Sequence, residues 1–398
     1  MNAELYEKTV RCIRCGFCLE ACPTFVITGQ ETESPRGRIY LVRSAIEGEL
    51  QWNKEVEEHL DTCLGCRACE TACPSGVEYG SILEMARAEL NDRKVRPFLS
   101  RLARGFLRKL LTTPHILKLA TRTGIQKMPQ LFAKLIGVKK VEAEMPRPQK
   151  AVAFRLSKSG NPVYFLEGCV MSAMFAETNA NTKSLIGKCG DAPISIPGCC
   201  GALELHDGRI KAARAKARKI IDTCADGAPI VTNSAGCGSA MKEYDELLKG
   251  DPIYAERAAD FSRRVQDISQ YLCKSDQQPS QKPLPLKVAY HDACHLAHGQ
   301  RIRKEPRLLL ERIPSIQLVE LEESDRCCGS AGIYDITEPE LARQLLDRKW
   351  KFIEESGAEI IATGNPGCLA WIAQAAREKG SDIKVMHTVD VLAMAIKD

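Results

Sequence analysis

Eight cysteines near the amino terminus repeat a single spacing that could hold iron–sulfur clusters. They form two blocks with the pattern C-x2-C-x2-C-x3-C-P, at Cys12, Cys15, Cys18 and Cys22 and again at Cys63, Cys66, Cys69 and Cys73. Three thiolates separated by two residues each can bind three iron corners of a cubane from one turn of chain, while the fourth cysteine leaves along the next segment. The spacing therefore predicts two [4Fe–4S] clusters.

The fourth cysteine of each block is expected to serve the other cluster, as it does in two-cluster ferredoxins. The predicted ligand sets are Cys12, Cys15, Cys18 and Cys73 for one cluster, and Cys63, Cys66, Cys69 and Cys22 for the other. Zinc is the alternative, since C-x2-C pairs also build zinc ribbons. A zinc site has no use for a third cysteine at the same spacing or for the proline. Zinc is therefore disfavoured here.

Eight further cysteines, in the second half of the chain, form two copies of another pattern. The first copy has Cys169, Cys199, Cys200 and Cys237, and the second has Cys294, Cys327, Cys328 and Cys368. The offsets between copies are 125, 128 and 131 residues, and a glycine follows each adjacent pair. Such regular offsets indicate a duplicated domain. Because the glycine allows a tight bend, we expect the four thiols of each copy to converge on one metal site.

The elements that must position these thiols differ between the two halves. The first half contains helical patterns, whereas from Pro162 onward short apolar runs alternate with amphipathic helices, which is typical of parallel α/β units. We predict a multidomain chain in which an all-helical, two-cluster ferredoxin-like domain precedes two repeated CCG-type α/β domains. The predicted divisions are a ferredoxin-like domain at 1–92, a helical connector at 93–161, and the two repeats at 162–280 and 281–398.

Composition limits the class of protein. The chain has 398 residues and a formal net charge of +5, which gives no reason to expect nucleic acid as a partner. It has no apolar run of the roughly 18 residues that a membrane-spanning helix needs and no secretory signal, so we expect it in the cytoplasm. Nineteen cysteines in that compartment indicate metal or redox chemistry rather than disulfides. Cys189, Cys224 and Cys273 fall outside every motif and are expected to be buried, inert thiols.

Residues 93–150 form a basic segment, with 15 lysines and arginines against two acidic residues. Apolar residues recur at three- and four-residue spacing, which predicts amphipathic helices. One interpretation is a solvated helical connector. The other is docking to an anionic membrane surface or an acidic partner, with Phe98, Phe106 and Phe132 among the apolar contacts.

The order of these motifs resembles that of the cysteine-rich CCG-domain proteins, and in particular of the iron–sulfur subunits of glycolate oxidase (glycolate dehydrogenase). The resemblance covers essentially the whole chain, including the sequence SPRGRIYLV at 34–42. It implies a subunit that relays electrons from a flavin-containing partner, which oxidises glycolate or a similar 2-hydroxy acid, towards the respiratory chain. It also implies a second flavoprotein-like subunit. Because the chain has no dinucleotide fingerprint, we expect the flavin and the catalytic residues on another polypeptide.

The two repeats depart from a related pattern. In the cysteine-rich subunit of heterodisulfide reductase, CCG repeats end in C-x2-C, but here GSA follows Cys237 and LAW follows Cys368. Whether each repeat holds an iron–sulfur cluster, zinc or nothing therefore stays open. Four histidines lie near these motifs and are expected to be hydrogen-bonding neighbours rather than ligands, namely His206, His291, His295 and His298.

Three other functions stay open on the sequence alone. The chain could be the corresponding subunit of a D-lactate or anaerobic glycerol-3-phosphate dehydrogenase, because these share the same blocks. It could be a catalytic disulfide reductase of the heterodisulfide type, which the missing fifth cysteine disfavours. It could also be a zinc-stabilised scaffold, which would contain zinc but no acid-labile sulfide.

Overall fold

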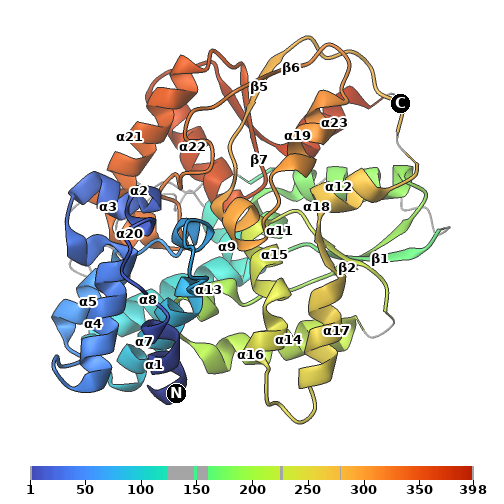
Figure 1. Cartoon of the computed structure of the whole chain (residues 1–398). Helices are drawn as coiled ribbons and strands as arrows, with labels where there is room; N and C mark the ends of the chain where they lie inside the picture. Colours follow the sequence, from blue (N-terminus) through green and yellow to red (C-terminus); the bar gives the residue numbers. More distant parts are fainter. Residues whose placement is uncertain (1, 123–147, 150–159, 225–226, 278, 397–398) are drawn as a thin grey trace.

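The computed structural model describes residues 2–122, 148–149, 160–224, 227–277 and 279–396. Three regions pack around a common centre: a helical amino-terminal region and two α/β repeats (Figure 1). In Figure 1 the helical region (blue) lies to the left, the first repeat (green to yellow) at the lower right and the second repeat (orange to red) at the top.

Short helices separated by cysteine loops make up the amino-terminal region. Its helices are α1 (Asn2–Val10), α2 (Cys18–Ala21), α3 (Pro23–Thr28), η1 (Glu31–Glu33), α4 (Pro35–Glu47), α5 (Lys54–Asp61), α6 (Ala68–Thr71) and α7 (Tyr79–Asp92). Two further helices follow, α8 (Phe98–Thr112) and α9 (Pro114–Arg122). Helix α8 buries Ala103, Leu107 and Leu110 and contacts α11 and α13 of the first repeat. This part of the basic segment is thus packed onto the protein along one face.

Each repeat is built on a four-stranded parallel sheet with the same strand order. The sheets are β2-β1-β3-β4 and β6-β5-β7-β8. Their strands are β1 (Pro162–Leu166), β2 (Ala192–Ile196), β3 (Ile230–Thr232), β4 (Val265–Asp267), β5 (Lys287–Tyr290), β6 (Gln317–Val319), β7 (Ile360–Thr363) and β8 (Lys384–His387). Tyr164 pairs with Ile194 and with Ile230, and in the second sheet Ala289 pairs with Val319 and with Ile361.

Helices cover both sheets. In the first repeat they are α11 (Cys169–Met174), α12 (Ala176–Lys188), α13 (Ala202–His206), α14 (Ile210–Thr223), α15 (Ala235–Lys242), α16 (Tyr244–Leu247), α17 (Ala255–Arg264) and α18 (Ile268–Lys274). In the second they are the π-helix η3 (His295–Gly299), α19 (Lys304–Glu311), α20 (Tyr334–Thr337), α21 (Pro339–Glu355), α22 (Pro366–Glu378) and α23 (Thr388–Ala395). Helices α12 and α18 contact α23 and α19, and one hydrophobic core runs through both repeats.

The predicted fold class is confirmed, since a helical region precedes two repeats with small parallel sheets. The identical strand order in the two sheets is the structural counterpart of the regular cysteine offsets. The four-way division of the chain stays a prediction, and residues 123–147 of the basic segment lie outside the described residues.

Candidate metal centres

The eight amino-terminal thiols are distributed between two cavities. The first is lined by Cys12, Cys15, Cys18, Cys69 and Cys73. The second is lined by Cys22, Cys63, Cys66 and Cys69. Each cavity therefore contains the four thiols of one predicted ligand set, and the ligand assignment stays a prediction. Cys69 lies between the two cavities and lines both.

The two cysteine loops share an unusual backbone shape. In the first block Arg14 and Gly16 have φ of 58° and 90°, and in the second Gly65 and Arg67 have φ of 63° and 65°. These are the same two positions of each block, with arginine and glycine interchanged. Left-handed backbone is costly for a residue with a side chain. Because both loops adopt it at the same two positions, we infer that the two loops have the same function. One result is that the amide of Gly65 donates a hydrogen bond to Cys63 Sγ over 3.4 Å.

The SPRGR sequence at 34–38 supplies one arginine to each cavity. Ser34 caps α4 by accepting a hydrogen bond from the Gly37 amide at 2.9 Å, which starts the helix beside the cysteine loops. Arg36 lines the first cavity and Arg38 lines the second. Gly37 cannot be replaced, because an added Cβ would lie 1.9 Å from the Glu31 carbonyl oxygen.

Arg38 is the centre of a buried polar network. Only 1% of its surface is exposed, and its guanidinium donates to the His59 carbonyl and to Glu33 Oε2, each at 2.6 Å. Burial alone would lower its pKa, but the neighbouring Cys63 thiolate and other anions raise the pKa above its ordinary value. The guanidinium is therefore charged, and it places a permanent positive charge beside Cys63 and Cys22.

The thiols themselves fit a metal cluster. Burial raises the pKa of Cys66 and of Cys69 well above the ordinary value, and it raises that of Cys18 to about 11. Without a cation these groups are neutral, whereas a bound metal deprotonates its thiol ligands. Four sulfurs around each cavity, with an arginine beside them, are suited to an anionic iron–sulfur cluster.

The cysteines of each repeat lie beyond the carboxyl ends of three adjacent strands. Cys169, the Cys199–Cys200 pair and Cys237 follow β1, β2 and β3, and their counterparts follow β5, β6 and β7. Because parallel strands end at the same edge of a sheet, the thiols meet there. Cys169 Sγ lies 3.6 Å from Cys199 Sγ. Hydrogen bonds also connect Cys199 with Cys200 and Cys200 with Cys237. The predicted convergence of four thiols is thus observed in the first repeat.

The second repeat has the corresponding arrangement. Hydrogen bonds connect Cys294 with Cys327, Cys327 with Cys328, and Cys328 with Cys368.

The neighbours of the two thiol sets differ. In the first repeat Lys216 Nζ lies 3.5 Å from Cys199 Sγ. Hydrogen bonds from Cys169 and Cys200, and then the Lys216 charge, lower the pKa of Cys199. In the second repeat His295 Nδ1 lies 3.6 Å from Cys294 Sγ.

The thiols of both repeats open onto one central cavity of about 240 Å³. The cavity is lined by Cys169, Cys199, Cys200 and Cys237 from the first repeat and by Cys294, Cys327 and Cys368 from the second. Leu107, Leu110 and Leu117 of α8 and α9 form an apolar part of its wall. In Figure 1, α9, α11 and α13 lie in this central region between the two sheets. The cavity therefore brings the two thiol sets to one place, which their separation in sequence did not indicate.

The amino-terminal and repeat sites adjoin at a pair of cysteines. Burial and then the nearby Cys294 thiolate raise the pKa of Cys66, so the two sulfurs are electrostatic neighbours. Both residues belong to the same hydrophobic core. Beside them Thr71 Oγ1 hydrogen-bonds with His298 Nδ1 at 3.0 Å. The thiol whose charge acts on Cys66 from outside the amino-terminal region thus belongs to the second repeat.

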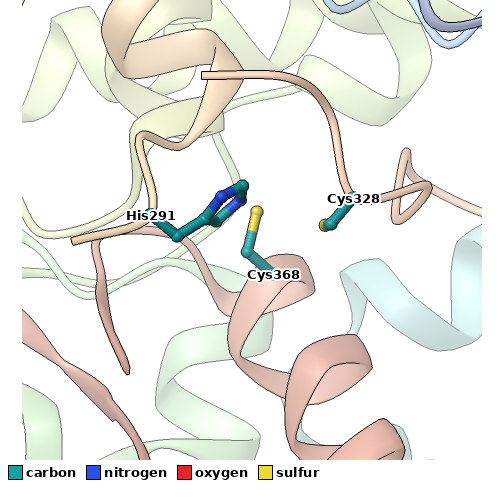
Figure 2. A group of neighbouring side chains, drawn as sticks. All are labelled: His291, Cys328 and Cys368. Carbon is teal, nitrogen blue, oxygen red and sulfur yellow. The ribbon is translucent and has the colours of Figure 1, made fainter. Parts of the chain in front are cut away.

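Three of the four histidines have the expected hydrogen bonds. His206 Nδ1 donates to Glu84 Oε1 at 2.8 Å, His298 Nε2 donates to the Asp325 carbonyl at 3.0 Å, and His295 contacts Cys294. The fourth, His291, lies against Cys328 and Cys368 (Figure 2).

Cysteines outside the motifs lie in hydrophobic cores. Cys189 and Cys224 are buried members of two such cores, and the half-buried Cys273 packs against the first of them. The expectation of full burial is therefore wrong for Cys273.

Several apolar side chains on the outer face of α8 are exposed. Phe98, Leu99 and Leu102 of α8 are 64%, 71% and 54% exposed, and Phe106 is 52% exposed. Phe132 lies outside the described residues. No helix among the described parts of the chain is both long and apolar enough to cross a membrane.

Comparison with known proteins assigns families to all three regions. Residues 8–77 match the 4Fe-4S dicluster domain, and residues 163–242 and 288–373 each match the cysteine-rich CCG domain. The probable glycolate oxidase iron–sulfur subunit of Bacillus subtilis is 36% identical over 98% of this chain and 94% of its own length. The glycolate oxidase iron–sulfur subunit of Escherichia coli is 33% identical over 97% and 94%. Lactate utilization protein A of Oceanobacillus iheyensis is 29% identical over 56% and 93%.

Proposed function

The chain belongs to the family of glycolate oxidase iron–sulfur subunits, and we propose that it carries electrons away from a flavin-containing partner that oxidises glycolate or a similar 2-hydroxy acid. The observation that carries the proposal is the distribution of eight thiols between two cavities, each lined by all four cysteines of one set, with Cys69 lining both. The relatives' names support glycolate as the substrate of the complex, and the dicluster match supports electron transfer.

We assign the ligands accordingly. Cys12, Cys15, Cys18 and Cys73 would hold one [4Fe–4S] cluster, and Cys63, Cys66, Cys69 and Cys22 the other. Such clusters accept and release single electrons when bound. Arg36 and Arg38 would offset the negative charge of the two sites. Because Cys66 faces Cys294, we place the electron exit of the amino-terminal region towards the second repeat.

The partners proposed for the chain are a flavin-containing dehydrogenase subunit and a second flavoprotein-like subunit. Electrons would continue towards the respiratory chain. Contact with the inner face of the cell membrane is proposed for the basic segment, because α8 exposes Phe98 and Leu99 within a strongly basic stretch. Replacing Arg101 and Lys109 by glutamine should weaken co-sedimentation with anionic vesicles, and binding that is indifferent to salt and to these changes would exclude the contact.

D-lactate is less well supported as the substrate of the complex. The relative named for lactate utilization matches only about half of this chain and at lower identity than the glycolate oxidase subunits. No observation here favours glycerol 3-phosphate or a substrate disulfide over glycolate.

The proposed function is tested by substrate-driven reduction in the assembled complex. Under anaerobic conditions, glycolate should produce the electron paramagnetic resonance signal of reduced [4Fe–4S] clusters on this chain, and D-lactate and glycerol 3-phosphate should act more slowly. The isolated chain mixed with glycolate is the control and should give no signal. Reduction of the isolated chain by glycolate, or faster reduction of the complex by either other substrate, would refute the proposal.

A further inference from the structure

One histidine of the second repeat lies within ligand distance of two thiols. The ligand atoms of His291, Cys328 and Cys368 all lie within 4.8 Å of one another. Figure 2 shows the three side chains converging from separate segments, with His291 after β5, Cys328 in the CCG loop and Cys368 on α22. Their exposed fractions are 0%, 1% and 4%, so water does not reach the group freely.

His291 differs from the other histidines near the cysteine motifs. The Cys328 thiol is hydrogen-bonded to its ring, but no nitrogen or oxygen atom among the described residues bonds either ring nitrogen, although the ring is fully buried. By contrast, His206 is hydrogen-bonded to Glu84, and His298 to the Asp325 carbonyl. A buried imidazole with a nitrogen that has no partner is unfavourable. A metal ion bound to a ring nitrogen removes this cost.

The spacing of the three atoms suits a single ion. In a tetrahedral zinc site, metal–sulfur and metal–nitrogen bonds of about 2.3 and 2.0–2.1 Å put neighbouring ligand atoms about 3.5–3.8 Å apart. The observed limit of 4.8 Å is about one ångström above that range. In a cubane each cysteine binds a different iron, so the sulfurs must stand further apart. Thiolate with imidazole is a ligand combination typical of zinc.

The first repeat cannot form the same site. Cys169 and Cys294 are equivalent, and three residues before them stand Leu166 and His291, both fully buried. The apolar leucine thus occupies the position of the imidazole. Conversely, Lys216 contacts Cys199, whereas the equivalent position in the second repeat is the buried Leu345. The duplicated sites have therefore diverged at these two positions. The second repeat has a cation of its own, the buried Lys349, beside Cys327 and Cys328.

We propose that His291, Cys328 and Cys368 bind one zinc ion, and that this site exists only in the second repeat. These three residues fill three of the four positions of a tetrahedral site. The site is independent of the two amino-terminal clusters and of the substrate of the complex, since none of its residues belongs to either cavity of the amino-terminal region.

X-ray absorption at the zinc edge tests the proposal, because iron does not contribute there. The full chain is purified anaerobically and supplied with zinc as the probe. The wild type should hold one zinc with sulfur ligands and one nitrogen ligand. His291→Leu, which copies the first repeat, should lose the nitrogen and weaken zinc retention against a chelator by at least about tenfold. His291→Cys should restore retention with sulfur ligands alone.

His298→Gln is the matched control, since it removes another buried histidine of the same loop and should leave the zinc spectrum unchanged. The His291→Cys arm keeps the test decisive if His291→Leu does not fold. The proposal is overturned if the wild type binds no zinc, if its shell contains sulfur only, if His298→Gln loses zinc as His291→Leu does, or if iron beyond the amino-terminal clusters occupies this site.

Discussion

At the scale of single residues, each amino-terminal cavity is lined by an arginine of α4 as well as by cysteines. Arg36 and Arg38 lie in the same turn of α4 but line different cavities. Residues two positions apart on a helix point in different directions. Their surroundings differ. Arg36 pairs with Glu31 near solvent, with 31% and 50% of the two side chains exposed, whereas Arg38 and Glu33 are almost fully buried.

The two arginines should therefore contribute very differently to stability. Arg38→Gln removes the guanidinium from the buried Glu33, which keeps only its contacts with His59 and Thr62 among the described side chains, and we expect the free energy of unfolding to fall by about 3 kcal/mol. Arg36→Gln removes an exposed pair and should cost less than about 1 kcal/mol. Denaturant unfolding under anaerobic conditions measures both. Equal losses in the two variants would contradict the role given to Arg38.

The cysteines could be predicted from sequence and the arginines could not. Spacing alone groups thiols such as Cys12 and Cys15, because the loop between them is short. The place of Arg38 depends on how α4 lies between the two cysteine blocks, which is a matter of tertiary packing. The place of His291 could not be predicted for a similar reason, since its closeness to Cys328 and Cys368 is visible only once the strands are assembled.

At the scale of elements, the CCG turn depends on a glycine packed against a helix. Gly201 and Gly329 have φ of 85° and 94°, and each lies against an alanine of the following long helix. An added Cβ would lie 3.4 Å from Ala213 in the first repeat but 2.7 Å from the Ala342 carbonyl oxygen in the second. The second turn is thus the tighter one.

Alanine should therefore be tolerated less well at Gly329 than at Gly201. Left-handed backbone alone costs about 1–2 kcal/mol for a residue with a Cβ. We expect roughly this loss in unfolding free energy for Gly201→Ala and at least about 2 kcal/mol for Gly329→Ala, where α21 must also shift. Thermal unfolding of both variants provides the comparison, and a larger loss at Gly201 would show that the contact with Ala342 is unimportant.

The elements themselves were largely predictable. Apolar runs such as the one at β1 alternate with amphipathic helices such as α14, and this pattern alone indicates parallel α/β repeats. What the pattern does not contain is the relative position of the repeats. Leu107 on α8 and Met174 on α11 line the same central cavity through contacts between distant parts of the chain, which local periodicity cannot encode.

At the scale of the whole molecule, the amino-terminal region is joined to both repeats by polar contacts. The Arg87 guanidinium donates to the His206 carbonyl of the first repeat at 2.8 Å, and Tyr334 Oη of the second donates to the Thr62 carbonyl at 2.9 Å. Glu338, at the start of α21, lies in the second of these interfaces. Burial, and then the charge of Asp61, raise its pKa from 4.5 to about 7 against the opposing effect of Arg104.

This carboxyl should make the molecule less stable as pH rises. Because the folded-state pKa of Glu338 is raised, its contribution to the free energy of unfolding is fully present below about pH 4.5. That contribution is lost as the pH increases to about 7. By linkage the loss is about 3 kcal/mol. Glu338→Gln should therefore stabilise the chain by up to that amount at pH 8 and by less than about 1 kcal/mol at pH 5. The pH dependence of thermal unfolding tests this, and a stabilisation equal at both pH values would contradict it.

Iron and acid-labile sulfide analysis of the chain purified without air tests the central claim most directly. The account predicts at least about eight irons and eight sulfides per chain, falling by about four of each in Cys73→Ser and unchanged in Cys189→Ser, which alters a thiol outside every motif. Colourless protein without iron, or zinc in place of iron in the amino-terminal cavities, would contradict it.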